Sequence, residues 1–214
     1  MSAERRLSRL DRLIGQLQHC VETLSNRSTS ARPMPGAQLA EADLSERERR
    51  HAAGLMRVNH AGEVCAQALY QGQALTARLH SVRSQMEQAA EEERDHLAWC
   101  EARLEALQSH TSRLNPLWYS LSFGLGAAAG ALSDRVSLGF VAATEELVGK
   151  HLEAHLDTLP EQDAKSRAVV EEMLCDELRH ARSALDAGGI DFPAPLKLAM
   201  RLASKAMTHG SYRL

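Results

Sequence analysis

The stretches EEERDHL at residues 91–97 and DELRHA at residues 176–181 decide the fold class, because each repeats a Glu-x-x-His unit inside a helical pattern. The two units are Glu93 with His96 and Glu177 with His180. Positions i and i+3 of an α-helix lie on one face, so the carboxylate and the imidazole of each unit project together. Apolar residues flank both units at spacings of three and four, which predicts that this face is buried. Carboxylates buried there need a compensating charge.

Two further predicted helices each carry one glutamate in an apolar stripe. Glu63 shares a face with Met56 and Tyr70, and Glu145 shares one with Val141 and Leu152. No Lys or Arg lies on the four stripes at the level of the glutamates, so a simple buried ion pair is not predicted. A metal centre is predicted instead, with four glutamates and two histidines as ligands: Glu63, Glu93, His96, Glu145, Glu177 and His180.

The ligand types in this set indicate which metal to expect. Imidazole together with carboxylate suits iron or manganese, and the absence of thiolate from the set argues against structural zinc. We therefore interpret three of the cysteines as small core residues: Cys65, Cys100 and Cys175. With no C-x-x-C pair in the chain, neither a zinc knuckle nor a disulfide framework is indicated.

Composition and helix order together predict an all-α fold. Aromatic residues make up only 4% of the 214-residue chain, β-branched runs are almost absent, and Ala and Leu are abundant. Helices are predicted over residues 45–80, 82–109, 137–159 and 162–187, as two hairpins joined by a long uncharged connection. This connectivity and ligand set are typical of ferritin-like di-iron or dimanganese four-helix bundles. We expect such a bundle with a long apolar crossover and extra N- and C-terminal amphipathic helices.

The predicted organisation has four parts. They are an N-terminal amphipathic helix (1–25), a linker rich in Ser, Pro and Gly (26–44), the bundle (45–189) with its apolar segment (114–132), and a basic amphipathic C-terminal helix with a tail (190–214). The N-terminal helix has four arginines in its first turns: Arg5, Arg6, Arg9 and Arg12. It either docks on the bundle or a second subunit, or lies on a membrane surface.

Charge and hydropathy indicate where the chain acts. A net charge of −3 gives no basic excess, so no nucleic-acid partner is expected. The N-terminus lacks the apolar region of a secretory signal, which predicts the cytosolic side. The 17 residues from 116 to 132 carry no charge but are short for a membrane span, so they are expected to lie in the interface, or else to form a buried crossover helix. Lys197, Arg201 and Lys205 make the last helix basic, which suits anionic lipid or simply solvent.

Four motifs resemble those of a known family, the demethoxyubiquinone hydroxylases of ubiquinone biosynthesis. They are MRVNHAGEVCAQALYQGQ at 56–73, EEERDHL at 91–97, ATEELVGKHL at 143–152 and DELRHA at 176–181, and the likeness extends from about residue 48 to the C-terminus. The resemblance implies the same six iron ligands, with Glu93 and Glu177 or their symmetric partners bridging two Fe²⁺ ions. His60, Tyr70 and His151 are expected around the ligands. Asn59 departs from the family, whose members carry Asp there.

The resemblance also implies a reaction and a location. It implies that O2 hydroxylates ring carbon C6 of a 2-polyprenyl-3-methyl-6-methoxy-1,4-benzoquinol, with NADH or the quinol itself as reductant. The expected partners are this polyprenyl quinol, the membrane lipid surface, a ubiquinone-biosynthesis complex and a second copy of the chain. The expected location is peripheral, on the cytoplasmic face of a bacterial inner membrane. The alternatives are a ferritin-like ferroxidase, a peroxidase without a quinol substrate, and a non-enzymatic quinone-binding scaffold.

Overall fold

A computed structural model describes residues 9–25 and 28–214, and within this part of the chain every regular element is an α-helix and no strand occurs. Arg5, Arg6 and Leu7 of the predicted N-terminal helix, and residues 26–27 of the predicted linker, lie outside the described residues. The helices are α1 (Arg9–Leu24), α2 (Glu46–Thr76), α3 (His80–Ala106), α4 (Asn115–Leu132), α5 (Asp134–Thr158), α6 (Ala164–Asp186) and α7 (Ala194–Arg213). The all-α prediction is confirmed.

Side-chain caps determine where several of these helices begin. Ser45 and Glu48 form the predicted capping box at the start of α2, where the Ser45 amide donates to the Glu48 carboxylate at 2.9 Å. The Ser133 hydroxyl accepts from the Val136 amide at 3.1 Å. Helix α5 therefore starts three residues before the predicted Ser137, and α2 ends at Thr76 rather than at residue 80.

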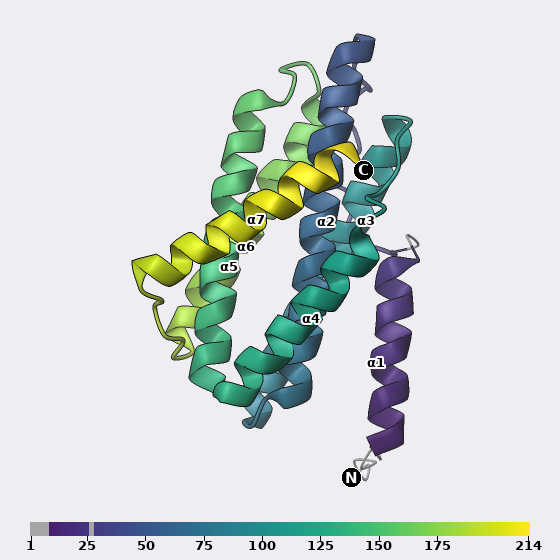
Figure 1. The fold of residues 1–214 in the computed structure, drawn as a ribbon. Helices are drawn as coiled ribbons and strands as arrows, with labels where there is room; N and C mark the ends of the chain where they lie inside the picture. Colours follow the sequence, from purple (N-terminus) through teal and green to yellow (C-terminus); the bar gives the residue numbers. More distant parts are fainter. Residues whose placement is uncertain (1–8, 26–27) are drawn as a thin grey trace.

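Helices α2, α3, α5 and α6 form the bundle, in which α2 packs against α3 and α5 packs against α6 (Figure 1). The crossover α4 lies obliquely on α2, and α7 runs across the bundle to bring the C-terminus back to α2. Close approach of α4 requires glycine, since a Cβ on Gly72 would overlap the Phe123 carbonyl and one on Gly126 would overlap the Leu69 carbonyl. The predicted apolar crossover is thus held directly against the bundle.

Two apolar layers divide the bundle core. One contains residues from the start of α2 and the ends of α3 and α5, with Met56, Leu104 and Leu152 all fully buried. The other contains residues from the opposite halves of the same helices, including Met86 and Leu138. The predicted ligand positions fall between these layers in the sequence of every bundle helix. The polar centre is therefore enclosed by hydrophobic packing above and below.

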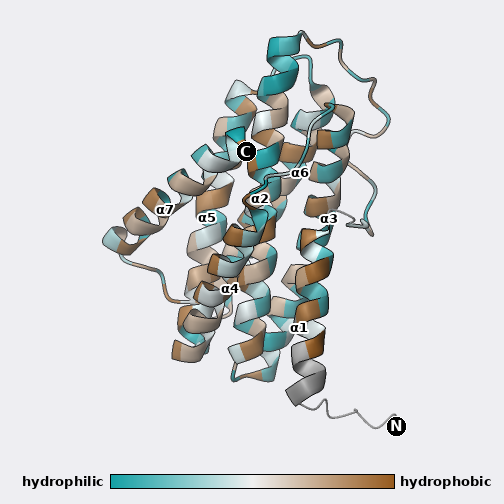
Figure 2. Cartoon of the chain, turned by 45° about the vertical axis from the view of Figure 1, so that its right-hand side comes forward, coloured by the Kyte–Doolittle hydropathy of each residue, from teal (hydrophilic) through white to brown (hydrophobic). Residues whose placement is uncertain are grey.

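An apolar stripe remains exposed on the crossover helix. Leu117, Leu121 and Leu125 recur every four residues on α4 and are all exposed, and Figure 2 shows hydrophobic residues along both α4 and α7. Within the described residues, no helix combines the length and hydropathy that crossing a bilayer would require. One prediction about core packing is wrong: Cys175 is exposed, because it faces away from the stripe of α6, while Cys100 is buried as expected.

Candidate metal centre

The structure brings the six predicted side chains together at the middle of the bundle. Two groups of potential ligand atoms each lie within 4.8 Å of one another, and all their residues are buried. One group is Glu63, Glu93, His96 and Glu177, and the other is Glu93, Glu145, Glu177 and His180. Because Glu93 and Glu177 belong to both groups, the arrangement has the form of two neighbouring sites that share two carboxylates.

Both histidines point the same ring nitrogen inward. His96 Nδ1 lies 2.8 Å from Glu93 Oε2 and 3.5 Å from Glu177 Oε1. His180 Nδ1 lies 3.1 Å from Glu93 Oε1. Each Glu-x-x-His unit therefore presents one nitrogen and one carboxylate to the centre, as its i, i+3 spacing predicts.

The outer nitrogens of the two histidines meet carboxylates from the opposite helix. His96 Nε2 lies 3.0 Å from Asp176 Oδ2 on α6, and His180 Nε2 lies 2.7 Å from Glu92 Oε2 on α3. Such a contact fixes the tautomer, so that Nε2 donates and Nδ1 is left free to bind a metal. These two carboxylates were missed from the sequence, although the signal was present: an acidic residue stands directly before the glutamate of each unit.

Burial and crowding of charge shift the pKa values in the centre. Burial, together with the charge of Glu93, raises the pKa of Glu63 to about 8. Burial and the neighbouring Glu145 and Glu93 raise the pKa of Glu177 well above its usual range. The carboxylates of the cluster therefore resist being ionised together unless a cation lies among them.

The donor set fits two divalent metal ions. Four carboxylates balance the charge of two such ions while both imidazoles stay neutral, whereas four carboxylates without cations repel one another. Among the described residues, the buried Glu145 Oε2 has no hydrogen-bond partner, and the buried Glu93 Oε1 and His180 Nδ1 lie 3.1 Å apart without meeting in hydrogen-bond geometry. Unpaired buried polar atoms are costly, and all three point into this cluster, so a bound metal would satisfy them.

The remaining predicted residues lie at different distances from the cluster. The Tyr70 hydroxyl donates to Glu145 Oε1 and is fully buried, so it contacts a predicted ligand directly. His60 is also buried, but its Nε2 lies 3.4 Å from Glu101 Oε1 rather than against a ligand. The His151 ring packs on His155 with centroids 4.0 Å apart, and it hydrogen-bonds to none of the six within the described residues. The Asn59 amide donates to Met56 Sδ.

The chain matches the family described as Ubiquinone biosynthesis protein COQ7 over residues 50–211. Relatives named 3-demethoxyubiquinol 3-hydroxylase match over nearly their whole length. The relatives from Ectopseudomonas mendocina (strain ymp) and Pseudomonas syringae pv. syringae (strain B728a) are 61% and 60% identical over 215 residues, with 100% of both chains covered. The one from Chromohalobacter salexigens is 60% identical over 211 residues, with 98% of this chain and 99% of the relative covered. The family match contains all six clustered side chains, whereas residues 28–49 precede it.

Proposed function

The chain belongs to the family of the ubiquinone biosynthesis protein COQ7, and from this membership we propose that it is a di-iron quinol monooxygenase that hydroxylates demethoxyubiquinol with O2. The family predicted from the sequence is confirmed. The observation that carries the proposal is the pair of buried ligand groups sharing Glu93 and Glu177, in a chain whose relatives are named as hydroxylases of this quinol.

The ring position predicted from the resemblance needs a chemical correction. Carbon C6 of a 6-methoxy ring already carries a substituent, so oxygen must be added at the one unsubstituted ring carbon of the 2-polyprenyl-3-methyl-6-methoxy-1,4-benzoquinol. One atom of O2 enters this C–H bond as the new hydroxyl. The other leaves as water after taking up two electrons and two protons, which come either from a quinol or from NADH together with one proton from solvent.

The proposed ligands form two neighbouring iron-binding sites. Glu63 and His96 would hold one ion, Glu145 and His180 would hold the other, and Glu93 and Glu177 would bridge them. The two ions, when bound, would supply the electrons that O2 chemistry requires. The surrounding apolar layers exclude water from the centre, and Tyr70 holds the Glu145 carboxylate from the second layer.

Substrate would approach from the side of His180. A cavity of about 190 Å³ lies there, lined among others by Tyr70, Val141, His180 and Ala184. The lining combines apolar side chains with a phenol, an imidazole and polar groups that include Glu92 and Arg179, so it offers both a surface for a substituted ring and hydrogen-bond partners for its hydroxyls. Tyr70 and Met86 also line a second cavity of about 190 Å³, together with residues that include Gln67, Gln71 and Ala74.

The polyprenyl tail requires contact with a lipid surface, and the exposed leucine stripe of α4 supports such contact. The C-terminal helix supports it less than its sequence indicates, because Lys197 Nζ is paired with Glu146 at 2.9 Å and with Asp191 at 2.7 Å. The exposed leucines favour quinol hydroxylation over ferroxidase activity, since soluble iron as substrate gives no reason to expose them. The peripheral location at a cytoplasmic membrane face, the biosynthetic complex and the homo-oligomer belong to the same proposal.

The test is turnover of a short-chain demethoxyubiquinol by anaerobically iron-loaded protein after addition of ¹⁸O2 and reductant. We expect a product carrying one ¹⁸O atom, lost in Glu177→Ala and retained in Glu171→Ala, an exposed residue of the same helix. Consumption of O2 without hydroxylated product would overturn the proposal in favour of a ferroxidase.

A second experiment tests the lipid-surface role of α4 with the variant Leu121→Asp. When the substrate is supplied in anionic vesicles, the variant should hydroxylate it more slowly than wild type, whereas the two proteins should have equal rates on substrate dispersed in detergent. Equal rates on vesicle-bound substrate would overturn the lipid-surface role of α4.

A further inference from the structure

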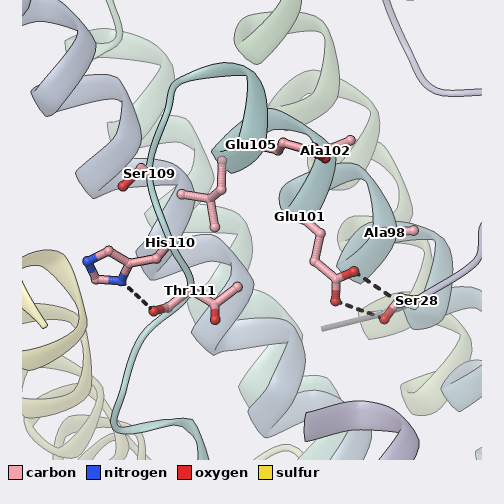
Figure 3. Close-up of a pocket in the computed structure, with 9 residues that line it drawn as sticks. Ser28, Ala98, Glu101, Ala102, Glu105, Ser109, His110 and Thr111 are labelled. Atoms are coloured by element: carbon pink, nitrogen blue, oxygen red, sulfur yellow. Dashed lines mark hydrogen bonds between the residues drawn. The ribbon is translucent and has the colours of Figure 1, made fainter. Parts of the chain in front are cut away.

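The segment from residue 28 to 45, whose residues up to 44 were predicted as part of a linker (26–44), lies against the bundle and is hydrogen-bonded to α3. The amide and hydroxyl of Ser28 each donate to the Glu101 carboxylate at 3.0 Å (Figure 3). Asp95 Oδ1 accepts from the Ser30 hydroxyl at 3.0 Å and from the Ala31 amide at 2.7 Å. Asp95 directly precedes the predicted ligand His96, so the segment is bound next to the metal centre.

Arg32 extends from this segment across the two helices that carry the Glu-x-x-His units. Its Nε donates to Asp95 Oδ2 on α3 at 2.8 Å, and its Nη2 donates to Asp176 Oδ2 on α6 at 2.6 Å. The same Asp176 oxygen lies 3.0 Å from His96 Nε2. Arg32 thus holds the carboxylate that orients His96.

Packing fixes the guanidinium in this position. Its Cζ lies 4.7 Å from the ring centroid of Trp99, which is buried on α3. The Trp99 ring in turn lies 5.4 Å from the His96 ring, centroid to centroid. A planar guanidinium can stack on an aromatic ring while donating to two carboxylates in different directions, which the single ammonium of a lysine does less well.

We propose that Arg32 is a positioning residue of the metal centre, which holds Asp176 against His96 Nε2 and so keeps His96 Nδ1 directed at the ion that Glu63 also binds. The proposal rests on the proposed di-iron centre and deepens it. It assigns a part of that centre to the segment that precedes the family match, which begins at residue 50. Removing an outer contact of this kind usually lowers metal affinity by roughly 10–100-fold. Because Arg32 acts on His96 only through Asp176, the loss on removing Arg32 should be near the lower end of this range.

The experiment is a titration of metal-free, full-length protein with Co²⁺, followed by its visible absorption. Wild type should bind two ions per chain. In Arg32→Ala, the affinity for one ion should fall about tenfold with a changed absorption band, while the second ion binds as in wild type. Arg32→Lys should recover part of the loss. The matched control is Arg50→Ala, a surface arginine on α2 that is paired only with Glu46 among the described residues.

The outcomes separate the two proposals. Wild-type protein that binds no Co²⁺ would overturn the metal centre itself. Wild type binding two ions, with Arg32→Ala binding both at unchanged affinity, would overturn the role of Arg32 alone. Equal weakening of both ions, accompanied by a lower unfolding temperature of the metal-free variant, would also overturn it, because Arg32 would then only stabilise the fold.

Discussion

The two halves of the metal centre use the same Glu-x-x-His unit but support the histidine differently. On the His96 side, Asp176 has only 8% of its side chain exposed and is held by Arg32 from outside the bundle. On the His180 side, Glu92 is 28% exposed, and its arginine partner is Arg179, which lies largely in solvent. One half is closed by the segment at 28–45, and the other borders a cavity.

This difference indicates a division of roles that the repeated motif does not show. Glu92, Arg179 and His180 all line the cavity of about 190 Å³ beside Tyr70. A half that must admit substrate or O2 cannot be sealed by a packed segment, whereas the other half can be. We infer that the His96 side is the fixed support of the centre and that the His180 side is its working face.

The largest expected effect comes from the carboxylates that both halves share. Glu177→Ala removes a ligand from both groups and leaves Glu93 as the single shared carboxylate, so binding of both iron ions should be weakened most, and activity lost with it. Glu63→Ala should lose mainly the ion on the His96 side, and Glu145→Ala mainly the ion on the His180 side. Iron content per chain together with Mössbauer spectra of ⁵⁷Fe-loaded protein distinguishes these patterns. If Glu63→Ala removed both ions as completely as Glu177→Ala, the two-site division would be wrong.

A smaller effect should separate the carboxylates behind the histidines. Asp176→Asn should weaken metal binding by roughly 10–100-fold, because the amide carries no charge and its one oxygen cannot replace both carboxylate oxygens, which accept from Arg32, His96 and Arg179. Glu92→Gln should weaken binding less, since water can reach its partly exposed site and replace the acceptor. Both are measured as Co²⁺ affinity of the full chain, with Glu171→Gln as control. Equal losses in the two variants would mean that the halves are supported alike.

The fold and the six clustered side chains could be predicted because their signal is local and periodic. A glutamate among residues spaced by three and four is visible in each helix, and bundle packing then brings the four stripes together. Capping chemistry at Ser45 was predictable for the same reason: it depends on residues three apart.

The support of the histidines could be predicted only in part, because it depends on contacts between distant segments. Asp176 pairs with a histidine 80 positions earlier, and Arg32 reaches it from 144 positions away. A Ser, Pro and Gly-rich stretch such as 28–37 has no periodicity that would indicate a packed face, so it was interpreted as a linker. The error at Cys175 was of another kind, because its position two residues before Glu177 already placed it outside the stripe of α6.

The smallest expected effect comes from the arginine that contacts both halves. Arg179 Nη2 donates to Asp176 Oδ1 at 2.7 Å and to Glu92 Oε2 at 3.2 Å, but 52% of its side chain is exposed. Exposed ion pairs contribute about 1 kcal/mol or less, so Arg179→Ala should change Co²⁺ affinity by no more than about fivefold at either ion. Arg32→Ala removes an arginine from the same Asp176 yet should cost more, because Arg32 is stacked on Trp99 and only 35% exposed. Arg179→Ala could instead weaken Co²⁺ binding as much as Arg32→Ala does. The orientation of His96 would then depend on the positive charge near Asp176 and not on the packing of Arg32, and the contrast between a closed His96 side and an open His180 side would be wrong.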